Sequence, residues 1–153
     1  MGKFRIAAHE DTGDILRIMR HYYEEDSYPF IESESRETVS RLIGDRNLGC
    51  LWVAEVDSRV AGYVAVTLGY SLEYRGRDAF IDELVIAEEH RGKGLGREAI
   101  DVATAWSREH GVNALHLEVE PHRKNAQELY RRAGFEDHNR HLMTIWLKGQ
   151  RRR

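Results

Sequence analysis

The chain has 153 residues, of which 41% are hydrophobic and 32% are charged, a balance that is typical of a folded globular domain and excludes disorder along its whole length. Its formal net charge is -3 although it ends in three arginines, and this mildly acidic body argues against nucleic acid as the main partner. A single cysteine excludes an intrachain disulfide, and no apolar run approaches the roughly 18 residues of a membrane span.

These limits predict one domain over residues 1–150 and a solvated basic tail at residues 151–153. The N-terminal segment has no apolar leader-like run, so we expect a cytoplasmic protein with no nucleic-acid or membrane partner. Cys50 opens an apolar, strand-like run. It is therefore expected to be a buried structural thiol rather than a nucleophile.

The first half of the chain predicts three strands and two helices. In chain order these are a strand over Lys3–Ala8, a helix capped by Asp11 and Thr12, a helix over Ser35–Ile43, and strands over Cys50–Val56 and Arg59–Leu68. Asp57 and Ser58 separate the last two strands, and a two-residue loop of this kind is typical of an antiparallel hairpin.

The second half alternates strands with helices. A polar connection over Gly69–Asp78 leads to a strand over Ala79–Ala87, a helix over Gly94–His110, a strand over Ala114–Glu120, a helix over Lys124–Ala133, and a final strand or hairpin with Phe135 and Leu142–Leu147. A central hairpin followed by two β-α-β crossovers predicts an α/β (α+β) fold. We expect a mixed antiparallel and parallel sheet of six to seven strands with helices on both faces.

The stretch EEHRGKGLGREA, between the strand over Ala79–Ala87 and the long helix, has three glycines interleaved with two cations. The first N–H groups of a helix have no partner within the helix, and glycines let the backbone approach a phosphate closely. The sequence therefore predicts a phosphate or pyrophosphate site here. No Gly-Lys-Ser/Thr ends the loop, and its third glycine comes one residue too early for the dinucleotide fingerprint.

Two blocks of the sequence resemble the GNAT N-acetyltransferase superfamily. The run RGKGLG, Arg91–Gly96, is similar to the R/Q-x-x-G-x-G/A motif of that superfamily, and AQELYRRAGFE, Ala126–Glu136, is similar to its A-x-x-L-Y-x-x-x-G-F signature. The blocks are separated by a helix and a strand, as in the family, and the resemblance spans nearly the whole chain. It implies a GNAT-like fold with a splayed central strand pair, and acetyl-CoA as the cosubstrate.

The resemblance also assigns residues to the cosubstrate. The strand backbone that pairs with the pantetheine arm is at Leu84, Val85 and Ile86, and the pyrophosphate loop consists of Arg91, Gly92, Lys93, Gly94, Leu95 and Gly96. Asn125, Ala126 and Tyr130 are further contacts that it implies. Many members have an asparagine seven residues before the tyrosine, whereas this chain has Arg123 there and an asparagine five residues before it.

Catalysis requires an acid for the leaving thiolate and a base for the amine. Tyr130 matches the family tyrosine near the sulfur, and its place on the apolar side of its helix is equally compatible with a core position. Candidate bases are Asp82, Glu83 and Glu118, with His116 a weaker one. Asp82 matches the polyamine-acetylating branch and Glu83 is nearer to other members. Only one of this pair is expected to face the cleft of an alternating strand.

The acceptor site is expected between the first two helices, where HYYEEDSYPF places Tyr23, Glu24 and Tyr28. Such a patch attracts a cationic amine, and a solvated acidic helix end is the alternative. The leading hypothesis is direct acetyl transfer to a primary amine of a small molecule in a ternary complex. The alternatives are a protein N-terminus or lysine as acceptor, and a non-catalytic CoA-binding module. We expect no metal, and a homodimer with Leu142–Leu147 as an edge strand.

Overall fold

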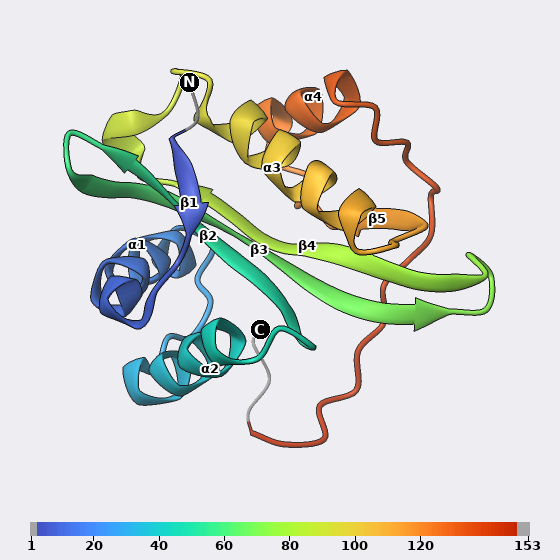
Figure 1. The fold of residues 1–153 in the computed structure, drawn as a ribbon, viewed down its shortest axis with the longest axis horizontal. Coiled ribbons are helices and arrows are strands. Elements are labelled where there is room, and N and C mark those ends of the chain that lie inside the picture. Colours follow the sequence, from blue (N-terminus) through green and yellow to red (C-terminus); the bar gives the residue numbers. More distant parts are fainter. Residues whose placement is uncertain (1–2, 150–153) are drawn as a thin grey trace.

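The computed structural model describes residues 3–149 of the chain and has a five-stranded sheet in the order β1-β2-β3-β4-β5 (Figure 1). The elements are β1 (Phe4–Ile6), α1 (Thr12–Glu25), α2 (Glu32–Gly44), β2 (Gly49–Val56), β3 (Arg59–Ser71), β4 (Gly76–Ile86), α3 (Leu95–Glu109), β5 (Ala114–Leu117) and α4 (Lys124–Arg132). Strands β1 to β4 are antiparallel, and β5 is parallel to β4. The expected mixed α/β architecture is confirmed.

Helices cover both faces of the sheet, as expected, with α1 and α2 on one side and α3 on the other (Figure 1). The period of two along β2 explains this: Leu51 and Val53 face α1 and α2, whereas Cys50 and Trp52 face α3. Cys50 is buried, as expected, and burial raises the pKa of its thiol. The apolar core is therefore divided into two layers by the sheet.

Local sequence patterns predicted most helices and strands correctly, but not every contact at their ends. The turn at Asp57 and Ser58 has positive φ at both residues, which is the conformation of a two-residue hairpin. The Asp11 carboxylate accepts the N–H of Ala8 at 2.8 Å and two N–H groups of Arg5, instead of capping α1. A single-turn helix before α1 brings these groups together.

Two expectations about the sheet are wrong. The stretch expected as a polar connection is mostly strand, because β3 extends to Ser71 and β4 begins at Gly76, and pairing between strands overrides local polarity. The final strand is absent, so the described residues form five strands rather than six or seven. The apolar alternation of Leu142–Leu147 specifies a strand only if another edge pairs with it, and in the described part of this chain none does.

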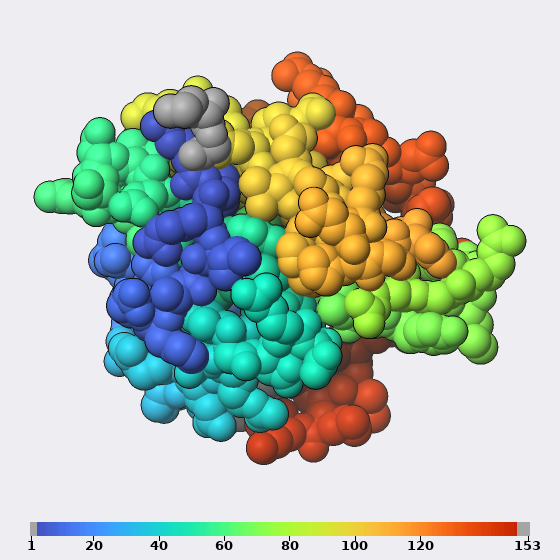
Figure 2. Space-filling view, in the orientation of Figure 1, coloured from blue at the N-terminus to red at the C-terminus, as the bar shows by residue number. Residues whose placement is uncertain are grey.

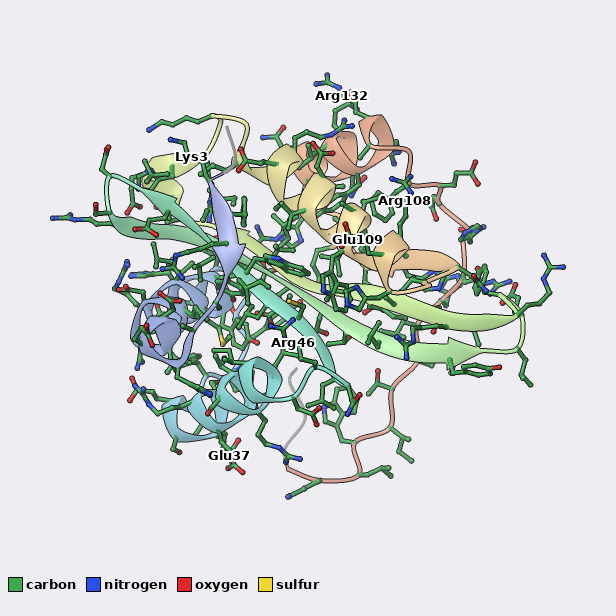
Figure 3. The ribbon with its side chains drawn as sticks, viewed as in Figure 1. Lys3, Glu37, Arg46, Arg108, Glu109 and Arg132 are labelled. Atoms are coloured by element: carbon green, nitrogen blue, oxygen red, sulfur yellow. The ribbon has the colours of Figure 1, made fainter. Side chains whose placement is uncertain are left out.

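Charged side chains of both signs are spread over the outer helix faces (Figure 3). Glu37 lies on α2, Arg108 and Glu109 lie on α3, and Arg132 lies on α4. Mixed signs of this kind make no extended basic field. Among residues 3–149, no helix has the length and apolarity needed to cross a bilayer.

Candidate active site

Strands β4 and β5 separate partway along their length. They pair only from Asp78 with Ala114 to Ile81 with Leu117, after which β4 continues to Ile86 and the chain leaves β5. Among the described strands, the backbone of Leu84–Ile86 therefore has β3 on one side and none on the other. This is the expected splayed strand pair, and it exposes an edge that an extended ligand can hydrogen-bond.

A cleft of about 500 Å³ lies along this edge. Most residues assigned to the cosubstrate line it, namely Leu84, Val85, Ile86, Arg91, Gly92, Gly94, Leu95, Gly96, Asn125, Ala126 and Tyr130. Lys93 does not line it, and its ammonium donates to the carbonyl of Glu89 at 3.1 Å. The cleft thus joins the strand edge, the glycine loop and the start of α4.

The glycine loop opens directly into α3. Gly92 and Gly94 have φ of +75° and +87°, a left-handed conformation that side chains disfavour, and no atom lies within 4 Å of a Cβ added to either. Gly94 is the N-cap of α3 and supplies no side-chain cap, so the first N–H groups of the helix are available to a ligand. A Cβ on Gly96 would lie 2.9 Å from Leu129, so this glycine permits close packing on α4. These features fit a pyrophosphate.

A β-bulge decides how the two strand carboxylates are arranged. The β3–β4 register passes from Val66 opposite Ile81 to Ala65 opposite Glu83, so Asp82 is the additional residue. The bulge leaves Asp82 exposed and turns Glu83 toward the α1 face.

Glu83 is held by two phenols. The hydroxyl of Tyr63, from β3, donates to one carboxylate oxygen at 2.7 Å, and the hydroxyl of Tyr23, from α1, donates to the other at 2.5 Å. Tyr63 is only 1% exposed, and its burial together with the Glu83 charge keeps the pKa of its phenol well above 10.0. Glu83 immediately precedes the cleft-lining residues Leu84–Ile86, so a fixed carboxylate stands beside the splay.

Tyr130 lies on α4 and lines the cleft. Its ring packs edge-on against Phe135, with the ring centres 6.0 Å apart. Burial raises the pKa of its phenol, and the nearby charge of Arg123 acts in the opposite direction. The phenol therefore keeps its proton at neutral pH and is available as a donor.

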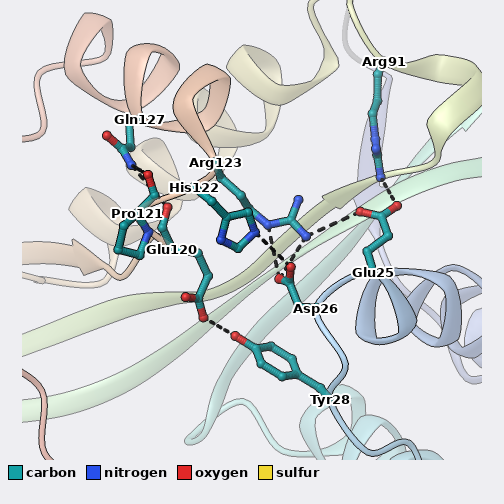
Figure 4. A network of polar contacts seen from close by, with 9 residues as sticks. All are labelled: Glu25, Asp26, Tyr28, Arg91, Glu120, Pro121, His122, Arg123 and Gln127. Atoms are coloured by element: carbon teal, nitrogen blue, oxygen red, sulfur yellow. Dashed lines mark hydrogen bonds and ion pairs between the residues drawn. The ribbon is translucent and has the colours of Figure 1, made fainter. Parts of the chain in front are cut away.

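The end of α1 is joined by ion pairs to both sides of the cleft (Figure 4). Asp26, whose side chain is 4% exposed, binds Arg123 at 2.9 Å and His122 at 3.1 Å. Glu25 binds Arg91 of the glycine loop at 3.2 Å and Arg123 at 3.4 Å. Two carboxylates of the expected acceptor patch therefore already have cationic partners within the chain.

Arg123 is the residue that sequence reasoning underestimated. It stands where the family motif has an asparagine, and its guanidinium carbon lies 4.8 Å from the centre of the Tyr22 ring. It reaches the cleft while it also binds both carboxylates at the end of α1. The shifted asparagine was the available signal, but only the fold shows what Arg123 contacts.

A second hollow of about 450 Å³ lies between the end of α1 and the loop after β5. Its lining residues are Glu25, Asp26, Ser27, Glu120 and His122, and Tyr28 donates a hydrogen bond to Glu120 (Figure 4). Glu24 lines neither hollow and is exposed near His21. Glu120 and His122 are acceptor-site candidates that the sequence did not single out, because their loop becomes adjacent to α1 only in the fold.

Glu118, the third base candidate, and His116, the weaker one, do not line the cleft. His116 contacts the Asp78 carboxylate at 3.1 Å and packs against the rings of Tyr74 and Phe80. Glu118 follows β5, is exposed, and lines neither hollow. Asp82 and Glu83 do not line either hollow, but they directly precede the cleft-lining residues Leu84–Ile86 on β4.

Comparison with known proteins agrees with this architecture. The model of the acetyltransferase (GNAT) family matches residues 15–135, and the chain belongs to that family. A thialysine N-epsilon-acetyltransferase of Bos taurus is 28% identical over 142 residues, which cover 87% of this chain and 83% of that protein. An uncharacterized N-acetyltransferase of Methanocaldococcus jannaschii is 26% identical over 141 residues, or 91% of this chain.

Some curated relatives are longer proteins. The match covers 62% of the Methanocaldococcus jannaschii protein and 26% of an uncharacterized N-acetyltransferase of Bacillus subtilis. Among solved structures, an integron cassette protein from the metagenome of Cole Harbour Salt Marsh has a TM-score of 0.87 and 30% identity, covering 97% of this chain and 92% of its own. A predicted acetyltransferase with acetyl-CoA from Clostridium acetobutylicum has a TM-score of 0.79 at 20% identity, covering 95% and 96%, which shows a shared fold.

Proposed function

We propose that the chain is a cytoplasmic, acetyl-CoA-dependent N-acetyltransferase that acts on a primary amine of a small molecule by direct transfer in a ternary complex. The observation that carries the proposal is the cleft that joins the unpaired edge of β4, the glycine loop and Tyr130. Family membership makes acetyl-CoA the matching cosubstrate. When bound, it supplies an activated acetyl thioester.

The chain's own groups would bind this cosubstrate along the cleft. The backbone of Leu84–Ile86 offers hydrogen bonds to an amide-bearing arm, and the uncapped N–H groups after Gly94 offer them to a pyrophosphate. Arg91 and Arg123 line the same cleft and add positive charge. Both kinds of contact hold the cosubstrate without depending on its acyl group.

Two side chains are proposed for proton transfer. Glu83 accepts the amine proton, because Tyr63 and Tyr23 hold its carboxylate in one orientation beside the splay. Asp82, exposed at the bulge, is the alternative base. Tyr130 gives its proton to the departing thiolate as the acyl bond passes from sulfur to nitrogen.

A small cationic amine is the proposed acceptor. The second hollow has three carboxylate residues, Glu25, Asp26 and Glu120, and His122, in the loop after β5, lines both this hollow and the cleft. Thialysine, which appears in the name of the Bos taurus relative, is a small amine of this class. The negative charge of these carboxylates would attract such a cationic compound. A protein N-terminus or a lysine side chain is the second acceptor class, and a peptide panel tests it.

Calorimetry with acetyl-CoA tests the proposal, with Gly94→Glu as the variant. Gly111→Glu is the matched control, because Gly111 also has a left-handed φ of +72° and open space around it, but lies beyond the other end of α3. We expect wild type and the Gly111 variant to bind and the Gly94 variant to lose binding. If the wild-type protein does not bind acetyl-CoA at millimolar concentration, the proposal that the cleft binds acetyl-CoA is refuted.

A panel of amines follows if acetyl-CoA binds. Diamines, polyamines, lysine analogues and short peptides are compared by release of free CoA. Turnover with a small amine supports the proposed acceptor class, and turnover with peptides alone replaces it with the protein class. Binding without turnover of any acceptor identifies a non-catalytic CoA-binding module.

A further inference from the structure

One carboxylate at the end of α1 is shared between the two sides of the cleft (Figure 4). Glu25 binds Arg91 of the glycine loop at 3.2 Å and Arg123, the residue before α4, at 3.4 Å. Both arginines line the cleft, whereas Glu25 lines the second hollow. Glu25 therefore connects the cavity proposed for the cosubstrate to the cavity proposed for the acceptor.

The other two carboxylates of the second hollow are held in different ways. Asp26 is 4% exposed and binds Arg123 at 2.9 Å, and Glu120 accepts a hydrogen bond from Tyr28. A buried ion pair resists separation, because the loss of one partner leaves an uncompensated charge. Glu25 is 38% exposed, and its ion pairs with the two arginines are longer than the pair of Asp26 with Arg123. The ion pairs of Glu25 are therefore the ones that a ligand exchanges most easily.

Arg91 is held by groups for which a ligand in the cleft would compete. Its Nε donates to the carbonyl of Ile86 at 2.9 Å, and one of its terminal N–H groups donates to Glu25. The Ile86 backbone belongs to the edge proposed to pair with the cosubstrate, and Arg91 itself lines the cleft at the glycine loop. Ion pairs between exposed single charges are weak, whereas the bond of an arginine to a phosphate group is charge-assisted and frequently bidentate. A pyrophosphate in the cleft would therefore draw Arg91 away from Glu25.

The charges at the end of α1 balance one another only while Arg91 belongs to the set. With His122 neutral, Glu25 and Asp26 carry two negative charges, and Arg91 and Arg123 carry two positive charges. The guanidinium of Arg123 is a departure from the family motif, which has an uncharged asparagine at this position. When Arg91 transfers to a pyrophosphate, two carboxylates share one guanidinium, and the second hollow gains a net negative charge.

We propose that Glu25 binds the ammonium group of the acceptor, and that it becomes available when the pyrophosphate of the cosubstrate takes Arg91 as its partner. This inference rests on the proposed function, and it assigns acceptor recognition to one residue. Before the cosubstrate binds, the two arginines neutralise the carboxylates at the end of α1, and a cationic amine binds weakly. After the cosubstrate binds, Glu25 attracts the amine. By linkage, the amine then raises the affinity for the cosubstrate by the same factor.

Calorimetry with acetyl-CoA alone tests the first half of this proposal. Because Glu25 competes with the pyrophosphate for Arg91, Glu25→Gln should tighten acetyl-CoA binding by about two- to fivefold, the range expected for an exposed ion pair. A carboxylate that only positions Arg91 predicts the opposite result, weaker binding. The gain should be lost when Glu25→Gln is combined with Arg91→Gln, because no guanidinium is then released.

Two other glutamates provide matched controls. Glu24→Gln removes a charge from the neighbouring position, where the side chain is 62% exposed and lines neither cavity, so it measures the general effect of a carboxylate on the binding of an anion. Glu73→Gln removes a carboxylate that is paired with Arg140 at the opposite end of β4, where the β3–β4 hairpin projects from the body of the molecule (Figure 2). Both controls should bind acetyl-CoA nearly as the wild type does, and circular dichroism establishes that each variant is folded.

Binding of amines to the CoA complex tests the second half. Thialysine and spermidine are the probes, and CoA replaces acetyl-CoA so that no transfer occurs. At constant ionic strength, the wild type should bind at least one probe more tightly with CoA than without it. Glu25→Gln should lose this difference, whereas Glu24→Gln and Glu73→Gln should keep it.

The outcomes separate this inference from the proposed function. A wild type that does not bind acetyl-CoA refutes the proposed function itself. If the wild type binds acetyl-CoA but Glu25→Gln binds it no more tightly than Glu24→Gln does, the inference is overturned while the proposed function stands. The same holds if neither probe gains affinity from CoA, or if Glu25→Gln retains the gain. Tighter binding of acetyl-CoA together with loss of the amine coupling, in Glu25→Gln and in neither control, supports the inference.

Discussion

Replacing Tyr63 with phenylalanine tests how the carboxylate beside the splay is held. Tyr63 is 1% exposed, and its hydroxyl donates to Glu83 at 2.7 Å, so Tyr63→Phe removes one oxygen and one hydrogen bond from a buried site. A hydrogen bond to a charged group contributes about 1.5–3 kcal/mol to the free energy of unfolding. We expect the variant to lose an amount in that range, while Tyr23 still donates to the other carboxylate oxygen.

The same substitution should change the pH dependence of activity if Glu83 is the base. Donation by Tyr63 favours the ionised carboxylate, so its loss moves the acid limb of the kcat/KM profile to higher pH. Tyr63 also makes the stability of the wild-type chain depend on pH in the alkaline range. The pKa of Tyr63 is held well above 10.0, so the native chain retains a proton that the unfolded chain loses, and stability falls as pH rises past about 10. Phenylalanine removes this contribution.

Urea denaturation at neutral pH and pH–rate profiles of wild type and variant provide the measurements. Tyr70→Phe is the matched control on the same strand, because Tyr70 is 79% exposed and a surface change of this kind is within about 0.5 kcal/mol of neutral. If Tyr63→Phe costs no more than Tyr70→Phe and leaves the acid limb in place, the argument that Tyr63 positions Glu83 is refuted.

Three further substitutions test the rest of the structure. Tyr130→Phe should lower kcat by about 10²–10⁴ with the KM for acetyl-CoA little changed, and an unchanged kcat would assign Tyr130 to packing alone. Arg123→Ala should cost about 1.5–3 kcal/mol in urea denaturation, because Asp26 is buried and loses its guanidinium partner; no loss would show that His122 suffices. The pKa of Asp11 is lowered, chiefly by its hydrogen bonds from Arg5, so the stability that the ionised carboxylate contributes is lost as pH falls below 3.8. Asp11→Asn should therefore make the free energy of unfolding less dependent on pH in this acid range. An unaltered dependence on pH would contradict this.

Much of the fold was accessible from local patterns. The β-rich apolar run of β2 and the helical period along α3 depend on which side chains are apolar, so both elements were predicted close to their observed bounds. The glycine loop could also be predicted, because Gly92 and Gly94 adopt a left-handed φ that glycine reaches without steric cost. Tyr130 was found through a motif of adjacent positions on one helix, and it lies in the cleft.

Elements that depend on a distant partner were not accessible in this way. The end of β3 and the start of β4 look polar in isolation and become strand through pairing with each other. The final segment looks like a strand and is not one among the described residues, because no edge of this chain pairs with it. Local composition therefore predicted a loop where pairing makes a strand, and a strand where no pairing occurs.

By itself the sequence determined the order of the elements from β1 to α4, the two core faces and the place of the glycine loop, since each follows from side-chain period or backbone freedom over a few neighbouring residues. Only the tertiary structure decided which carboxylates are available for chemistry. The bulge at Asp82 turns Glu83 toward two phenols, and the approach of α1 to the loop after β5 pairs Asp26 with Arg123. These arrangements depend on strand register and on contacts across the fold, which no local pattern of residues encodes.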